Sequence, residues 1–101
     1  MQARKGNFCG ILNGIDNELW NPATDIHLVH RYSMHDVSGK RRCKADLQRA
    51  SGLEINPRIP VIGFVSRLAH QKMADIILES VPGILAAGAQ FALVGQGDPE
   101  L

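Results

Sequence analysis

Two short apolar runs stand out in the second half of the chain, at residues 61–65 and 90–94. The first, Val-Ile-Gly-Phe-Val, follows Pro57 and Pro60, and a strand does not extend back through proline. Its length and its β-branched and aromatic residues are typical of a buried parallel strand. The second, Gln-Phe-Ala-Leu-Val, has the same character. We expect both runs to be strands.

The residues between these runs repeat with the period of a helix. Apolar side chains recur at spacings of three and four from about residue 72 to residue 87, which predicts an amphipathic helix. Gly88 follows at the position where a helix-ending glycine belongs. Pro82 lacks a backbone N–H, so we expect a kink or a restart near Val81. The apolar stripe consists of Met73, Ile77, Val81 and Ile84, widened by Leu78 and Leu85.

A strand, a helix and a strand in this order form one βαβ unit with a right-handed crossover. Ligands of parallel sheets bind at the carboxyl ends of the strands. The polar turn 66–72 and the glycine turn 95–98 should therefore lie at the same edge of the sheet. Two strands are too few for an independent parallel sheet, so we expect an α/β fragment of something larger.

Arg67 and Lys72 place two cations in the first of these turns. A strand, a short polar turn and a helix start form the usual seat of a phosphate, because backbone N–H groups and the helix N-terminus attract anions. Arginine adds a forked donor and lysine a point charge. The alternative is an ordinary surface arginine and a helix-start lysine, and these residues alone do not separate the two interpretations.

The first half of the chain is less regular. Residues 8–15 are consistent with a short strand, with Asn13 and Gly14 as a turn. Residues 16–25 have the composition of a loop, which we expect Trp20 to anchor by burying its ring.

A helix is expected over residues 38–51, with Gly52 at its C-cap. Its apolar positions are Cys43, Leu47 and Ala50, which fall four and three residues apart. Cations crowd the other positions, and a solvated charged face explains them more simply than docking to an anionic partner. These cations are Lys40, Arg41, Arg42, Lys44 and Arg49.

Three of the four histidines fall within residues 26–37, namely His27, His30 and His35. No cysteine or carboxylate completes a recognised spacing of metal ligands. Solvated or hydrogen-bonded histidines are therefore the better interpretation, and we expect no metal site.

Composition narrows the classes of protein. The 101 residues, 45% apolar and 21% charged, suit one small globular domain. A net charge of +1 favours neither nucleic acid nor membrane as a partner. No run approaches the roughly 20 apolar residues of a membrane span. The distant pair Cys9 and Cys43 indicates reduced thiols, and we expect a cytoplasmic chain without a signal peptide.

Four stretches carry a family resemblance: Gly-Ile-Leu-Asn-Gly-Ile-Asp at 10–16, Trp-Asn-Pro-Ala-Thr-Asp at 20–25, Val-Ser-Arg-Leu-Ala-His-Gln-Lys at 65–72 and Leu-Val-Gly-Gln-Gly-Asp-Pro at 93–99. In this order and spacing the chain resembles the bacterial glycogen synthases and plant starch synthases. The looser segment 31–53 also fits, so the resemblance covers nearly the whole chain.

The resemblance implies part of a GT-B fold, in which two Rossmann-like domains face each other across a cleft. Residues 1–57 would be the end of the N-terminal glucan-binding domain and the interdomain connection. Residues 58–101 would begin the C-terminal nucleotide-sugar domain. The implied activity transfers glucose from ADP-glucose to the non-reducing end of an α-1,4-glucan with retention, without metal or cofactor.

The resemblance also assigns residues. Arg67 and Lys72 match the pair that contacts the donor diphosphate and would be catalytic. Asn13 matches an asparagine near the cleft. Gly95 and Asp98 match the glycine turn on the nucleotide side. All five would bind substrate.

The chain also departs from the family pattern. Met73-Ala74 stands where a glycine and a larger apolar residue are common, and the methionine side chain would crowd the phosphate seat. A lysine-glycine-glycine donor loop, the cleft histidine and aspartate, and a later acidic motif are absent. We therefore expect the chain to be inactive without the remainder of the enzyme, as a fragment, a truncated gene model or a degenerate gene.

Two other functions remain open. One is a stand-alone, non-catalytic module that binds a nucleotide diphosphate or docks onto a partner. The other is a different GT-B transferase, against which the stretches 10–16 and 20–25 argue.

Overall fold

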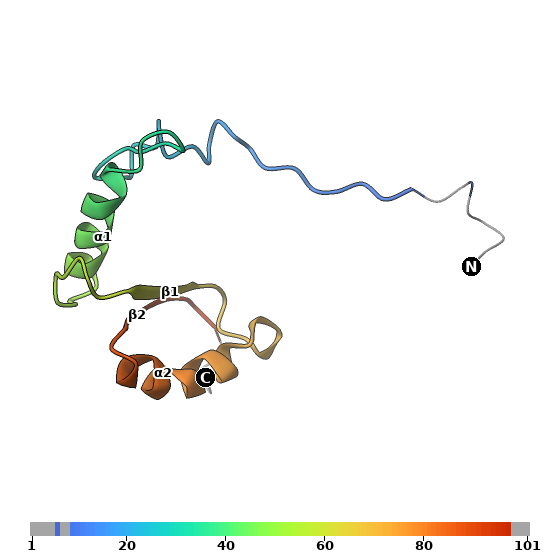
Figure 1. Ribbon diagram of the computed structural model, residues 1–101. Coiled ribbons are helices and arrows are strands. Elements are labelled where there is room, and N and C mark those ends of the chain that lie inside the picture. Colours follow the sequence, from blue (N-terminus) through green and yellow to red (C-terminus); the bar gives the residue numbers. More distant parts are fainter. Residues whose placement is uncertain (1–5, 7–8, 98–101) are drawn as a thin grey trace.

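The computed structural model describes Gly6 and residues 9–97 (Figure 1). An extended N-terminal segment leads to one helix, and a strand–helix–strand unit follows it. No helix in this part of the chain is long and apolar enough to cross a membrane. The elements are α1 (Gly39–Ala50), β1 (Val61–Val65), the 3-10 turn η2 (His70–Lys72), α2 (Ala74–Ala86) and β2 (Gln90–Val94).

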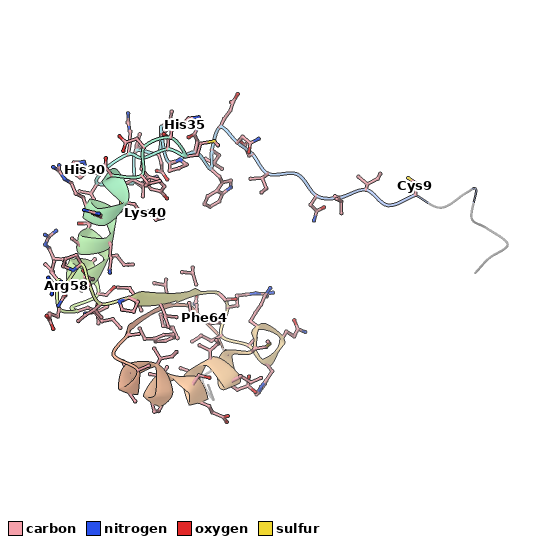
Figure 2. The ribbon with its side chains drawn as sticks, viewed as in Figure 1. Cys9, His30, His35, Lys40, Arg58 and Phe64 are labelled. Carbon is pink, nitrogen blue, oxygen red and sulfur yellow. The ribbon has the colours of Figure 1, made fainter. Side chains whose placement is uncertain are left out.

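The two strands form a parallel pair, as the sequence predicts. Val61 lies opposite Gln90, and Val65 lies opposite Val94. Helix α2 connects the strands and covers one face of the sheet, and Phe64 lies between β1 and this helix (Figure 2). The other face is open at its carboxyl end, where the exposed fractions are 80% for Val65 and 64% for Val94. The chain is thus a small α/β structure built on one βαβ unit.

Helix α2 differs from its prediction at two points. It begins at Ala74 and not near residue 72, because His70–Lys72 winds as a separate 3-10 turn. It then runs as one helix through Pro82, so of the kink or restart predicted near Val81 the restart is wrong, and the kink stays a prediction. A proline removes only one hydrogen bond from the helix ladder. The side chains of the neighbouring turns pack against the sheet and hold the helix together across the gap.

The apolar stripe of α2 is only partly buried. Ala74, at its start, is fully buried, and Ile77, Val81 and Ile84 are half-buried. Met73 precedes the helix and is exposed. Leu85 is also exposed, and Ala74 and Ala92 are the only buried apolar residues in the described part of the chain.

Helix α1 ends as predicted but buries an unpredicted face. Gly52 follows it with a φ of 66°, a conformation that glycine adopts without strain. The expected apolar position Leu47 is 44% exposed, whereas the side chain next to it, Gln48, is 1% exposed. The apolar periodicity of this helix therefore misidentified the side that packs.

A network of amides explains the burial of Gln48. Its side-chain N–H groups donate to the Asn56 carbonyl at 3.1 Å and to Gln90 Oε1 at 2.7 Å. Its oxygen accepts the Asn56 backbone N–H at 3.2 Å. Gln90 in turn donates to the Glu54 carbonyl at 2.8 Å. Because every amide finds a partner, these polar groups can be buried, and they tie α1 to β2.

Most of the cationic side chains of α1 bind other groups of the chain, whereas a purely solvated face would leave them in water. Lys44 Nζ donates to the carbonyls of Pro57 and Ile59, which holds the connection between α1 and β1 against the helix. Three more of the five cations bind within the chain. Lys40 contacts Tyr32 at 2.9 Å, Arg42 contacts His30 at 2.9 Å, and Arg49 contacts Asp46 at 3.4 Å.

The N-terminal segment departs most from the prediction. The strand predicted over residues 8–15 is not formed at residues 9–15, because no second strand lies beside them in the described structure. Residue 8 lies outside the described residues. The Asp16 carboxylate accepts the N–H groups of Glu18 and Leu19 at 3.0 and 2.9 Å and shapes the next turn. Trp20 is 73% exposed, so the predicted anchor is not formed.

Candidate functional site

The turns that follow β1 and β2 meet at the carboxyl edge of the sheet. The Ser66 N–H donates to the Val94 carbonyl at 3.2 Å, and the Leu68 N–H donates to the Gln96 carbonyl at 3.1 Å. Leu68 and Gly97 also form a parallel bridge beyond the strands. The two turns therefore continue side by side after the sheet ends, as the βαβ prediction requires.

Glycines make this close approach possible. A Cβ added at Gly95 would lie 2.6 Å from the Ser66 carbonyl oxygen, and one at Gly97 would overlap the Leu68 carbonyl. Any larger residue would separate the turns. Packing therefore gives Gly95 a role beyond the substrate contact that the resemblance implies, and that contact stays a prediction.

Arg67 and Lys72 project from this edge of the sheet. Arg67 lies in the turn after β1, Lys72 ends η2, and both are exposed. Within the described part of the chain, neither side chain makes a hydrogen bond or an ion pair. The Lys72 backbone is held by its N–H, which donates to the Ala69 carbonyl at 2.9 Å. Both cations can therefore turn towards an anion without breaking a hydrogen bond or an ion pair to any described residue.

His70 and Asp75 form a pair beside Lys72 that the sequence did not indicate. His70 Nδ1 lies 3.2 Å from Asp75 Oδ2. The hydrogen bond from His70, followed by that from the Ile76 N–H, holds the pKa of Asp75 below its ordinary value. The pair links η2 to the first turn of α2. Its separation of five residues matches no regular helix face, so no sequence pattern could have revealed it.

Met73 joins η2 to α2 in a left-handed conformation, with φ of 56° and ψ of 33°. It is the only residue other than glycine with positive φ in the described chain. This conformation costs an L-residue about 1–2 kcal/mol, whereas glycine adopts it freely. The glycine that the resemblance leads us to expect here therefore has a backbone reason. The Met73 side chain is 53% exposed, so the strain at this residue comes from its backbone conformation and not from crowding of the side chain.

Of the two remaining predicted site residues, only Asn13 is described, and it does not join this edge. Asn13 is exposed in the N-terminal segment, which extends away from the sheet (Figure 1). Asp98 lies outside the described residues. Among the residues that the structure describes, no three histidine, cysteine or acidic side chains gather as metal ligands. His30 instead accepts a hydrogen bond from Arg42.

Comparison with known proteins decides the family. Soluble starch synthase 1 of rice, Oryza sativa subsp. japonica, is 46% identical over 99 residues, which are 98% of this chain and 15% of the relative. Starch synthase 1 of wheat, Triticum aestivum, matches with the same identity and coverage. This chain is a homologue of the starch synthases. No family model matches it.

A solved starch synthase has the same local fold. The catalytic domain of starch synthase IV from Arabidopsis thaliana, bound to ADP and acarbose, superposes with a TM-score of 0.85 and 36% identity. The match covers 98% of this chain and 20% of that domain. The βαβ unit and the preceding helix thus correspond to a section of a starch synthase catalytic domain.

The starch synthase relatives also bear on location. The names of the rice and wheat proteins assign those two enzymes to chloroplasts or amyloplasts. Our expectation of a cytoplasmic chain came from the cysteines and from the lack of a signal peptide, and it stays a prediction.

Proposed function

We propose that this chain supplies the donor-side edge of an α-glucan synthase. In this proposal Arg67 and Lys72 bind the diphosphate of ADP-glucose, and glucose passes to the non-reducing end of an α-1,4-glucan with retention of configuration. No metal or cofactor takes part. Residues 1–57 belong to the acceptor side and the interdomain connection, and residues 58–101 begin the donor domain. The chain alone is inactive.

The observation that supports this most strongly is the meeting of the two turns at one sheet edge. The N–H of Leu68 on the Gln96 carbonyl holds the turns together at 3.1 Å. Arg67 and Lys72 extend from one of them without an internal partner in the described chain. Two cations that have no partner among the described residues, beside a strand end and the start of a 13-residue helix, suit a diphosphate.

The chemistry gives these cations a catalytic role. Negative charge grows on the diphosphate as the glucosyl–phosphate bond breaks. Fixed positive groups stabilise this charge more in the transition state than in the ground state, which lowers the barrier. Loss of either cation in the complete enzyme should cost about 3 kcal/mol of transition-state stabilisation.

The comparisons support both ligands of the proposal at the level of the family. The Arabidopsis relative was solved with ADP and acarbose. ADP is what remains of ADP-glucose once glucose has been transferred, and acarbose is an oligosaccharide analogue. This chain spans only 15% of its rice relative, so most surfaces that could hold a glucan lie beyond the segment compared.

A titration of the full chain with ADP, and separately with UDP, tests the proposal. Amide NMR at low salt should show shifts in residues 66–72 and 95–97 with ADP. A folded chain that shifts with neither nucleotide would refute a donor site on this chain. Two results together would favour a non-catalytic diphosphate-binding module. The first is equal shifts with ADP and UDP in a stable monomer. The second is a lack of transfer activity when the chain is mixed with the catalytic domain of a relative from which this segment has been removed.

A further inference from the structure

A basic hollow lies at the end of α1 that is away from the sheet. It has a volume of about 310 Å³ and is lined by His30, Arg31, Ser38, Gly39 and Arg42. His30 and Lys40 mark this end of the helix in Figure 2. With 12 residues α1 is about 18 Å long, so the hollow is well separated from Arg67 and Lys72.

The walls of this hollow are fixed by contacts within the chain. Arg42 donates to His30 Nε2 at 2.9 Å, and the Cys43 thiol donates to the His30 carbonyl at 3.0 Å. A Cβ at Gly39 would overlap the Arg31 carbonyl, so only glycine lets the helix start approach the loop this closely. The hollow is therefore a built feature of the fold and not a gap between loose segments.

Its charge is poorly balanced. Residues 30–44 contain five lysines and arginines and one carboxylate, a net charge of +4, whereas the whole chain carries +1. The carboxylate, Asp36, already accepts the Ser38 N–H at 2.9 Å. The exposed Arg31 side chain makes no hydrogen bond to any described residue. Arg42 donates one of its five N–H groups to His30, and the other four can donate to a ligand.

We propose that this hollow binds a small phosphate-bearing anion between Arg31 and Arg42. An arginine fork matches the oxygens of a phosphate group. An anion here would also offset the repulsion between two guanidinium groups that share one hollow. Because Arg42 can only donate, His30 Nε2 must accept, and the His30 Nδ1 then carries a proton as a further donor. This binding site is independent of the proposed donor edge.

Phosphate titration of the full chain tests the proposal. Amide NMR follows Gly39 and Arg42 while sodium phosphate replaces sodium chloride at constant ionic strength. We expect saturable shifts at millimolar phosphate. Arg31→Gln should weaken this binding about tenfold, since a charge-assisted hydrogen bond is lost. Arg49→Gln removes an equal charge from the same helix, and Arg67→Gln removes one from the donor edge; both should leave the shifts unchanged.

Three outcomes would overturn the proposal. They are no phosphate-dependent shift of Gly39 or Arg42 in the full chain, folded or not, a shift that does not saturate with phosphate, and phosphate binding that is weakened equally by Arg31→Gln and Arg49→Gln. A parallel titration with glycerol 3-phosphate identifies the source of the phosphate group. Tighter binding than inorganic phosphate would assign the hollow to organic phosphate monoesters, and equal binding would assign it to phosphate itself.

Discussion

The βαβ unit and the N-terminal segment show two ways in which a chain can acquire local order. In residues 61–97 the backbone groups pair across β1 and β2, and α2 covers one side of the sheet. In residues 9–37 the turns are held by side chains that bind the backbone two or three residues away, as Asp16 does for Glu18 and Leu19.

The two regions differ most in what they bury. Leu12 is 94% exposed and Trp20 73% exposed in the N-terminal segment, whereas Ala92 of β2 is 9% exposed. Local hydrogen bonds define the turns of the segment, but no side chain of residues 9–37 is fully buried, and burial of apolar surface is the main favourable term in folding. The comparison therefore places most of the stability of this chain in the βαβ unit and in its junction with α1.

The junction gives the largest expected effect. Gln48→Ala leaves the buried Gln90 Oε1 and the Asn56 backbone N–H without their partners, so the free energy of unfolding should fall by about 3 kcal/mol. Urea unfolding followed by circular dichroism measures the loss. The exposed Gln71 is the matched control, and Gln71→Ala should change little. A loss of the same size in both variants would mean that α1 is not tied to the sheet through Gln48.

The next effect separates the two regions directly. Gly97→Ala places a Cβ against the Leu68 backbone and should cost about 2 kcal/mol, as overpacking does. Gly10 in the N-terminal segment has no atom within 4 Å of the equivalent position, so Gly10→Ala should be nearly neutral. Thermal unfolding of the two variants provides the comparison. Similar melting temperatures would contradict the tight pairing of the turns.

Met73→Gly should act in the opposite direction. It relieves the left-handed strain before α2 and should stabilise the βαβ unit by about 1 kcal/mol after the loss of chain entropy. Met34, in the other region, is 87% exposed and has no positive φ, so Met34→Gly should bring no gain. The urea midpoints of the two variants decide the question. A lower urea midpoint for Met73→Gly would show that contacts of the methionine side chain contribute more to stability than relief of the backbone strain does.

The smallest effect concerns acid. The pKa of Asp75 lies below its ordinary value of 3.8 because of His70. A carboxyl with a lowered pKa in the folded state contributes stability that is present above pH 3.8 and is lost as the pH falls through the folded pKa. Asp75→Asn should therefore flatten the acid limb of a stability–pH curve.

Asp36 allows the same comparison in the N-terminal region. The Ser38 hydroxyl and N–H lower its pKa too. Because little packed structure surrounds it, Asp36→Asn should leave the acid limb of global unfolding almost unchanged. An equal response to both substitutions would mean that the two regions unfold as one unit.

Much of the βαβ unit could be predicted because its signals are local. The strands are short apolar runs, and Gly52 and Gly88 both adopt positive φ after their helices. The order of elements alone then implied that the turns 66–72 and 95–98 would share an edge. Of the kink or restart expected near Val81, the restart does not occur, because tertiary packing outweighs the loss of one hydrogen bond.

The other features depend on partners distant in sequence. Gln48 is buried by Gln90, 42 residues later, and nothing near Gln48 indicates this. Trp20 was expected to find a core, but no apolar surface of the described chain covers it. The roles of Arg67 and Lys72 rest on the resemblance, because exposed cations carry no packing signal.

The most direct test of the donor edge measures ADP affinity in four chains: the unaltered protein, Arg67→Gln, Lys72→Gln and Arg58→Gln. Arg58 is exposed on the connection before β1 and serves as the charge-matched control. We expect Arg67→Gln and Lys72→Gln each to weaken ADP binding about tenfold, while Arg58→Gln binds as the unaltered protein does. Equal affinity in all four chains would contradict a diphosphate site between Arg67 and Lys72.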